Sequence, residues 1–120
     1  MSDSKVHLMV RYVDDAAIAD CLDVKLNEEL SIQSWGDEIY ALIQSCNEEK
    51  RVVVNFSNVK FMSSSALRVL ITANTKAKAK GITLFLCGVD ENILEVFKIT
   101  KLDTIFKIRP SEVEALHSLL

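Results

Sequence analysis

The segment that decides the fold is RVVVNFSNVKFMSSSALRVLITANTKAKAKG, residues 51–81. It opens with β-branched residues at 52–54, which are typical of a buried strand. Three serines follow at 63–65, and a helix-patterned stretch then ends at Gly81. We therefore expect the serines to lie where a buried strand ends and a helix begins. A helix N-terminus carries unpaired N–H groups and partial positive charge, so a hydroxyl there can cap the helix or carry a phosphate that the helix end helps to hold.

The residues before this segment predict two strands and a helix. Apolar and polar residues alternate over 6–12, as in a half-buried strand, and a second strand is expected over 17–24. Asn27 is placed to cap a helix whose apolar residues recur at helical spacing as far as Cys46. Gly36 weakens that helix by about 1 kcal/mol relative to alanine, which predicts irregular first turns.

The residues after the segment continue the alternation of strands and helices. A buried strand is expected over 82–87, a helix capped by Asp90 as far as Ile99, and a last strand over 104–108. Ser111 begins a capping box for a C-terminal helix. The apolar face of that helix is expected to comprise Val113, Leu116, Leu119 and Leu120.

Composition and element order together predict one α/β domain over residues 1–120. Hydrophobic residues make up 49% of the chain and the mean hydropathy is +0.19, so both faces of the sheet are expected to be covered. The order ββαβαβαβα predicts a four- to five-stranded mixed sheet with helices packed mainly on one face.

Charge and cysteine content exclude several classes of function. A net charge of −3 and a pI near 5.4 give no electrostatic basis for binding nucleic acid directly. No apolar run approaches the ~20 residues of a membrane-spanning helix, and the N-terminus lacks the features of a signal peptide. We therefore expect a cytoplasmic protein without membrane insertion. The three cysteines, Cys21, Cys46 and Cys87, are widely spaced and fit neither a disulfide framework nor a zinc site. We expect them to be small buried hydrophobic residues. We also expect the chain to need no metal or cofactor.

Helical spacing divides the central helix into a buried arc and an exposed line. Ser64 lies four residues before Arg68, and the exposed line continues through Thr72 and Thr75. Lysines at the end of this helix are expected to form a solvated face: Lys76, Lys78 and Lys80. The buried arc is expected to comprise Leu67, Val69, Leu70, Ile71, Ala73 and Ala77.

The three serines have different positions in this pattern. Ser63 is best placed as the N-cap, and Ser65 is expected to point more toward the core because it precedes Val69 by one turn. Spacing alone favours the interpretation that the serines only end a strand and cap a helix.

The whole pattern resembles the STAS domain, and in particular the bacterial anti-sigma factor antagonists. The stretch VVVNFSNVKFMSSSALRVLI resembles their signature, in which a hydrophobic strand is followed by Phe-Met/Ile-Asp-Ser-Ser-Gly-Leu-Gly and a helix. VFKITKLDTIFKI resembles their third helix and last strand, and SEVEAL the start of their C-terminal helix. Upstream, Lys25-Leu26-Asn27 stands where the family has x-Leu-Asp. The resemblance covers nearly the whole chain.

The resemblance implies a phosphorylation switch at the serines. In that family an anti-sigma factor that is also a serine kinase phosphorylates the first serine of Asp-Ser-Ser, which corresponds to Ser64; Ser65 and Ser63 are less favoured. The implied partner surface is Ser63, Ser64, Ser65, Arg68, Thr72 and Thr75. The implied partners are the anti-sigma factor/serine kinase and a phosphatase, with the chain a monomer or weak dimer. This chain departs from the signature, because it has Ser63 for the Asp and Ala66 and Arg68 for the two Gly residues.

Two alternatives remain open at this point. An enzyme is the weaker one, since no Ser-His-Asp, Cys-His or metal-ligand spacing is recognisable and we expect no catalytic residue; His7 and His117 are expected at the surface or rim. The other is a STAS adaptor without a phosphoryl switch, as a subunit of a larger signalling scaffold or of a lipid-transport complex. The sequence does not choose between the switch and the adaptor.

Overall fold

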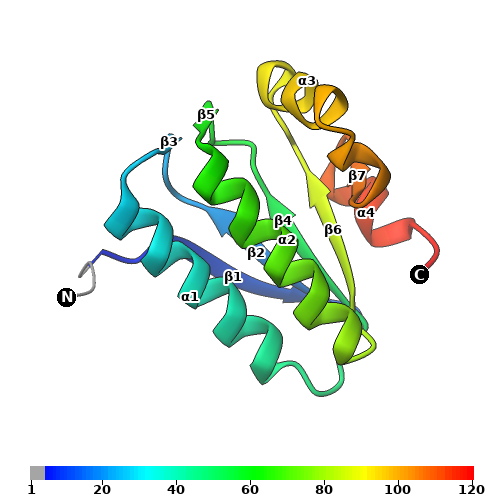
Figure 1. Cartoon of the computed structure of the whole chain (residues 1–120). Helices are drawn as coiled ribbons and strands as arrows, with labels where there is room; N and C mark the ends of the chain where they lie inside the picture. The colour runs from blue at the N-terminus through cyan, green and yellow to red at the C-terminus, as the bar shows by residue number, and fades with distance from the viewer. Residues whose placement is uncertain (1–4) are drawn as a thin grey trace.

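The computed structural model describes residues 5–120 of the chain. Its main sheet has five strands in the order β1-β2-β4-β6-β7 (Figure 1). They are β1 (Leu8–Val13), β2 (Ala16–Cys21), β4 (Arg51–Asn55), β6 (Thr83–Cys87) and β7 (Lys107–Arg109). β1 is antiparallel to β2, and the other neighbouring strands are parallel. The expected mixed sheet is confirmed.

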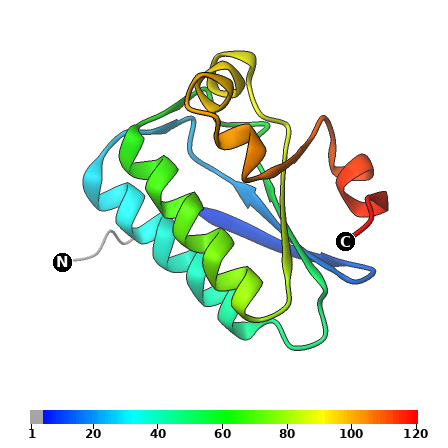
Figure 2. The same cartoon turned by 45° about the vertical axis from the view of Figure 1, so that its right-hand side comes forward.

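Helices cover both faces of this sheet unequally. α1 (Glu29–Ser45) and α2 (Ser64–Ala79) lie side by side on one face, and α3 (Glu91–Ile99) follows β6 near one end of the sheet (Figure 2). A 3₁₀ turn at Leu102–Thr104 connects α3 to β7. The short α4 (Glu112–His117) packs on the opposite face. The helices are therefore mainly on one face, as expected.

A second sheet of two short strands ties the starts of α1 and α2 together. β3 (Lys25–Leu26) pairs in parallel with β5 (Phe61–Met62), and the N–H of Ser63 donates to the carbonyl of Leu26 at 2.9 Å. Strands of two residues leave no periodic pattern, which is why they were not predicted. They hold in place the serine turn, residues 63–66.

The apolar run in β4 is explained by burial on two sides. Val52 and Val54 face the layer of α1 and α2, Val53 faces α4, and none of the three has accessible surface. A strand covered on both faces needs an apolar side chain at every position. Each fully buried valine contributes ~1.5–3 kcal/mol relative to an exposed one.

α1 and α2 approach each other closely at a glycine. A Cβ atom at Gly36 would lie 3.1 and 3.2 Å from the two γ-methyl groups of Val69, closer than ordinary contact. The expected irregularity of the first turns is wrong, because α1 is continuous and the missing side chain makes room for α2. Asn27 is not the N-cap either: Glu28 occupies that position, without a side-chain capping bond.

Several predicted strand boundaries also shift in the structure. The first strand begins at Leu8 rather than at residue 6, the second ends at Cys21, and the last spans Lys107–Arg109. The helix caps at Asp90 and Ser111 are confirmed, since each side chain accepts a backbone N–H of its own helix.

The predicted apolar face of α4 is largely wrong. Ala115 is the buried residue of this helix and Leu116 packs beside it, whereas Leu119 is 91% exposed. The helix ends at His117, so the last two leucines lie beyond it. The buried arc of α2 is likewise narrower than expected, because Ile71 is exposed.

Candidate functional site

The serine turn presents one hydroxyl at an uncapped helix end. Ser64 is the first residue of α2 and is exposed. The carbonyl of Ser63 accepts the N–H groups of Ala66 and Leu67 at 3.1 and 3.2 Å. Within residues 5–120, the N–H groups of Ser64 and Ser65 have no acceptor, and the first turn of α2 contains no acidic residue. This end of α2 therefore offers donors and positive potential next to the Ser64 hydroxyl.

Ser63 lies at the N-cap position, as predicted, but its hydroxyl is used differently from the expectation, and Ser65 is placed differently. Ser63 occupies the N-cap position with extended φ and ψ of −80° and 169°, but its hydroxyl does not cap the helix. The Oγ atom of Ser63 is instead buried, with no hydrogen-bond partner among the described residues. Ser65 is exposed, so the expectation that it points toward the core is wrong.

The rest of the expected surface lies on the solvent side of α2. Arg68, Thr72 and Thr75 are all exposed, so the structure brings Ser64 and these three residues onto one face of the helix. The Thr75 hydroxyl donates to the carbonyl of Ile71 at 3.2 Å. Arg68 makes no hydrogen bond or ion pair with any other described residue. One turn after Ser64, α2 therefore carries a solvated cation.

An apolar hollow that was not predicted adjoins the serine turn. It encloses about 170 Å³ between β5, the first turns of α2 and α3. Phe61 and Val96, at its rim, are 50% and 43% exposed. The only sequence feature that could have indicated this hollow is the apolar pair Phe61-Met62 directly before the serines. That pair is equally consistent with the end of a buried strand. The lining residues are Lys60, Phe61, Met62, Leu67, Asn92, Ile93 and Val96.

The family model of the STAS domain matches residues 12–115. This chain belongs to the STAS domain family. The suspected family is thereby confirmed.

Solved structures share the fold at low sequence identity. A STAS-domain anti-sigma factor antagonist protein from Planctomyces limnophilus is 18% identical, with a TM-score of 0.79 over 91% of this chain and 94% of that one. An anti-sigma factor antagonist from Mycobacterium paratuberculosis is 17% identical, with a TM-score of 0.79 over 97% and 96%. The Bacillus cell fate determinant SpoIIAA in its phosphorylated form is 16% identical, with a TM-score of 0.67 over 91% and 96%. These likenesses establish the fold.

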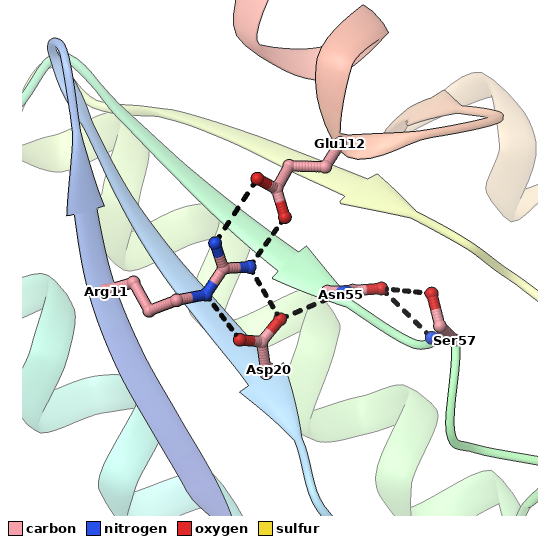
Figure 3. Close-up of polar contacts among 5 residues, drawn as sticks. All are labelled: Arg11, Asp20, Asn55, Ser57 and Glu112. Atoms are coloured by element: carbon pink, nitrogen blue, oxygen red, sulfur yellow. Dashed lines mark hydrogen bonds and ion pairs between the residues drawn. The ribbon is translucent and has the colours of Figure 1, made fainter.

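Away from the serine turn, a cluster of polar side chains in this STAS domain holds α4 to the sheet (Figure 3). The Arg11 guanidinium donates to Asp20 at 2.7 and 3.0 Å and to Glu112 of α4 at 2.6 and 3.3 Å. The hydrogen bonds from Arg11 hold the pKa of Asp20 below its usual value, and the Asn55 amide, which donates to Asp20 at 2.9 Å, acts in the same direction. Every member of this cluster has a partner within it, so we assign it to structure rather than to ligand binding.

Next to this cluster, the loop at Ser57 leaves no room for a side chain at position 88. Ser57 donates its N–H and its hydroxyl to the Asn55 side-chain oxygen at 3.0 and 2.6 Å. Gly88 has φ +66°, and a Cβ there would lie 2.4 Å from the Ser57 Oγ. A glycine is therefore required at this position on both grounds.

Two titratable groups outside these clusters, His7 and Lys80, were expected at the surface but make contacts within the fold. His7 is fully buried, and its Nδ1 contacts the Asp23 carboxylate at 2.6 Å, so its expected surface position is wrong; His117 is exposed. Lys80 is not simply solvated, because its Nζ donates to three carbonyls at the C-terminal end of α1. Such a cation offsets the negative end of the helix dipole.

The three cysteines are free and buried, as predicted. Burial raises the pKa of Cys21 to about 12 and that of Cys87 to about 11, and it also raises the pKa of Cys46. These thiols stay protonated at neutral pH. Within residues 5–120, no group of three or more His, Cys, Asp or Glu side chains is placed to hold a metal ion, and no helix is long and apolar enough to cross a membrane.

The lowered pKa of Asp20 predicts an acid-sensitive contribution to stability. Because the folded-state pKa is below the unfolded value, the contribution is present above the unfolded pKa, near 4, and is lost as pH falls through the folded pKa. Asp20→Asn should cost about 1 kcal/mol of unfolding free energy at pH 7, since the Asp20 and Arg11 side chains are 23% and 39% exposed. The cost should shrink in acid. Urea unfolding from pH 7 to pH 2 measures this, with the exposed Asp37→Asn as control. Parallel pH curves for wild type and Asp20→Asn would contradict the assignment.

Proposed function

We propose that this STAS domain is an anti-sigma factor antagonist whose binding is switched by phosphorylation of Ser64. In the unmodified state it binds an anti-sigma factor that is also a serine kinase, in the cytoplasm; phosphorylation releases it, and a phosphatase restores the first state. The domain acts as a binding module and not as an enzyme. The observation that carries the proposal is the exposed Ser64 hydroxyl at the uncapped start of α2, beside an apolar hollow.

Accessibility favours Ser64 over its neighbours as the phosphoacceptor. A kinase must bring the hydroxyl into its own active site, which the buried Oγ of Ser63 does not permit unless the turn opens. Ser65 is exposed as well, so access alone leaves two candidates. The family register selects Ser64, and its place as the first residue of α2 puts it nearest to the unpaired N–H groups.

The charge of a phosphate explains how the switch would work. A phosphoserine adds about −1.5 to −2 charges at neutral pH. A partner that inserts an apolar side chain between Phe61 and Val96 would cover the Ser64 side chain at the same time, because the hollow extends to Leu67 in the first turn of α2. Removing the charged phosphate from water in that interface costs several kcal/mol, which is enough to release the partner.

Arg68 has a second role in this proposal. It is exposed, has no partner among the described residues and follows Ser64 by one helical turn, so its guanidinium can reach a phosphate there. Paired with Arg68 and with the N–H groups of α2, the phosphate would be stable on the free domain. This stabilises the released state rather than the complex.

Phosphosite mapping tests the assignment. The full chain is incubated with its cognate kinase and ATP, and the modified residue is located by fragmentation mass spectrometry. We expect phosphate on Ser64, its loss in Ser64→Ala and its retention in the matched variant Ser65→Ala. Modification of Ser65 or Ser63 in the wild type, with Ser64 unmodified, would contradict the register. A chain that remains unphosphorylated after prolonged incubation would favour the alternative function, a fixed adaptor in a signalling scaffold or lipid-transport complex.

The pairing with Arg68 makes a separate prediction for the phosphorylated domain. A nearby guanidinium favours the dianion, so the second pKa of the phosphate should lie below its ordinary value of about 6 and should rise in Arg68→Ala. Phosphorus NMR titration measures that pKa directly, with Lys78→Ala, at the far end of α2, as the control for a general loss of positive charge. Superimposable curves for wild type and Arg68→Ala would show that Arg68 does not contact the phosphate.

A further inference from the structure

One side chain of the serine turn is a buried donor without an acceptor. The Oγ atom of Ser63 is buried and has no hydrogen-bond partner among the described residues, although the residue as a whole is half-buried. The large majority of buried side-chain polar atoms in native structures are paired, because an unpaired one destabilises the fold. Neither the sheet nor the cap of α2 uses this hydroxyl, so its role is to be sought in another state of the turn.

The backbone of Ser63 is held on both sides, whereas its side chain is not. The N–H donates to the carbonyl of Leu26 at 2.9 Å, and the carbonyl accepts from Ala66 and Leu67 at 3.1 and 3.2 Å. The hydroxyl is carried by a single torsion, χ1, which moves between staggered rotamers. In the present rotamer the hydroxyl has no hydrogen bond to lose. Rotation about χ1 can therefore carry it from its buried position to the N-cap position while the backbone bonds stay in place.

Two backbone donors beside this hydroxyl also lack an acceptor. Within residues 5–120 the N–H groups of Ser64 and Ser65 are unpaired, and the first turn of α2 has no acidic residue. A phosphate on the Ser64 hydroxyl would bring three strong acceptor oxygens and about −1.5 to −2 charges to these donors. Hydrogen bonds to an ionised acceptor are roughly twice as strong as neutral ones. The turn therefore has an excess of donors that a phosphate matches.

We propose that the Ser63 hydroxyl turns outward and donates to the phosphate when Ser64 is phosphorylated. Ser63 is then a positioning residue, which fixes the phosphate at the start of α2 and stabilises the released state. The inference rests on the proposed function, because it takes the phosphate to be on Ser64. At the N-cap position the Ser63 oxygen can also accept the N–H of Ser65, as capping serines do, so that both the donor and the acceptor of the hydroxyl are used.

This role explains why a serine suits position 63 of this chain, where the Asp-Ser-Ser signature has an acid. An ionised carboxylate accepts hydrogen bonds and donates none, and next to a phosphate it disfavours the dianion because it is a like charge. A hydroxyl is neutral and supplies a donor. In this chain the phosphorylated turn therefore has one more attractive contact, and one fewer repulsive charge, than the signature would give it.

Phosphorus NMR titration tests the contact in the full chain, with phosphoserine incorporated at position 64 during translation. A hydrogen bond to the phosphate favours its dianion, so Ser63→Ala should raise the second pKa by about half a unit, a roughly threefold change in proton affinity. Ser63→Thr, which keeps the hydroxyl, should titrate as wild type. The matched control is Ser45→Ala, at the end of α1. Equal pKa values in wild type and Ser63→Ala would overturn the proposal, and so would an equal rise in Ser63→Thr.

Melting temperatures give a second readout, with opposite signs in the two states of the turn. In the unmodified chain Ser63→Ala removes a buried, unpaired hydroxyl and should raise the melting temperature; with phosphoserine at position 64 it removes a donor to the phosphate and should lower it. A shift of the same sign and size in both states would overturn the proposal and leave the proposed function standing, since neither kinase nor partner is present. Conversely, opposite shifts together with undiminished binding of the phosphorylated chain to the anti-sigma partner would support the contact and contradict the proposed function.

Discussion

Burial of β4 on both faces is the constraint on which the rest of the structure depends. Val52, Val53 and Val54 are fully covered, so layers on both sides of the sheet must assemble around this strand. The chain leaves its carboxyl end, pairs β5 with β3 and enters α2 at Ser64. The position of the serine turn therefore depends on how β4 is buried and on the pairing of β5 with β3.

The main elements follow from local pattern, whereas the exceptions are set by partners distant in the sequence. The β-branched run and the periodic helices, two of which are capped by Asp90 and Ser111, specify their own conformations. His7 is buried because Asp23 is placed to meet its ring, and the exposed Lys80 is tied to α1 because that helix ends beside it. In the sequence, Gly36 looks like a residue that weakens its helix. In the structure, its missing side chain leaves room for Val69 of the neighbouring helix. Neither spacing nor composition encodes such contacts.

In the candidate site, too, some features follow from local sequence pattern and others from contacts with distant residues. Helical spacing placed Ser64, Arg68, Thr72 and Thr75 on one exposed line, and the structure places them there. Spacing placed Ser63 correctly at the N-cap but wrongly directed Ser65 toward the core. It also did not show that the Ser63 hydroxyl is buried, in a turn that a backbone bond ties to Leu26 of β3. The apolar hollow was missed for a related reason: Phe61 and Val96 come together only through the packing of α3 against β5.

The measurement that tests the central claim most directly is the affinity of the anti-sigma partner for Ser64→Asp, by isothermal titration calorimetry. Asn47→Asp, which adds the same charge in the exposed loop after α1, is the matched control. A carboxylate at Ser64 should weaken binding by about tenfold or more with little change in melting temperature, because it must be desolvated in the interface. Asn47→Asp should bind as wild type. Equal affinity of wild type and Ser64→Asp would contradict the account and indicate an adaptor whose binding does not respond to charge at the serine turn.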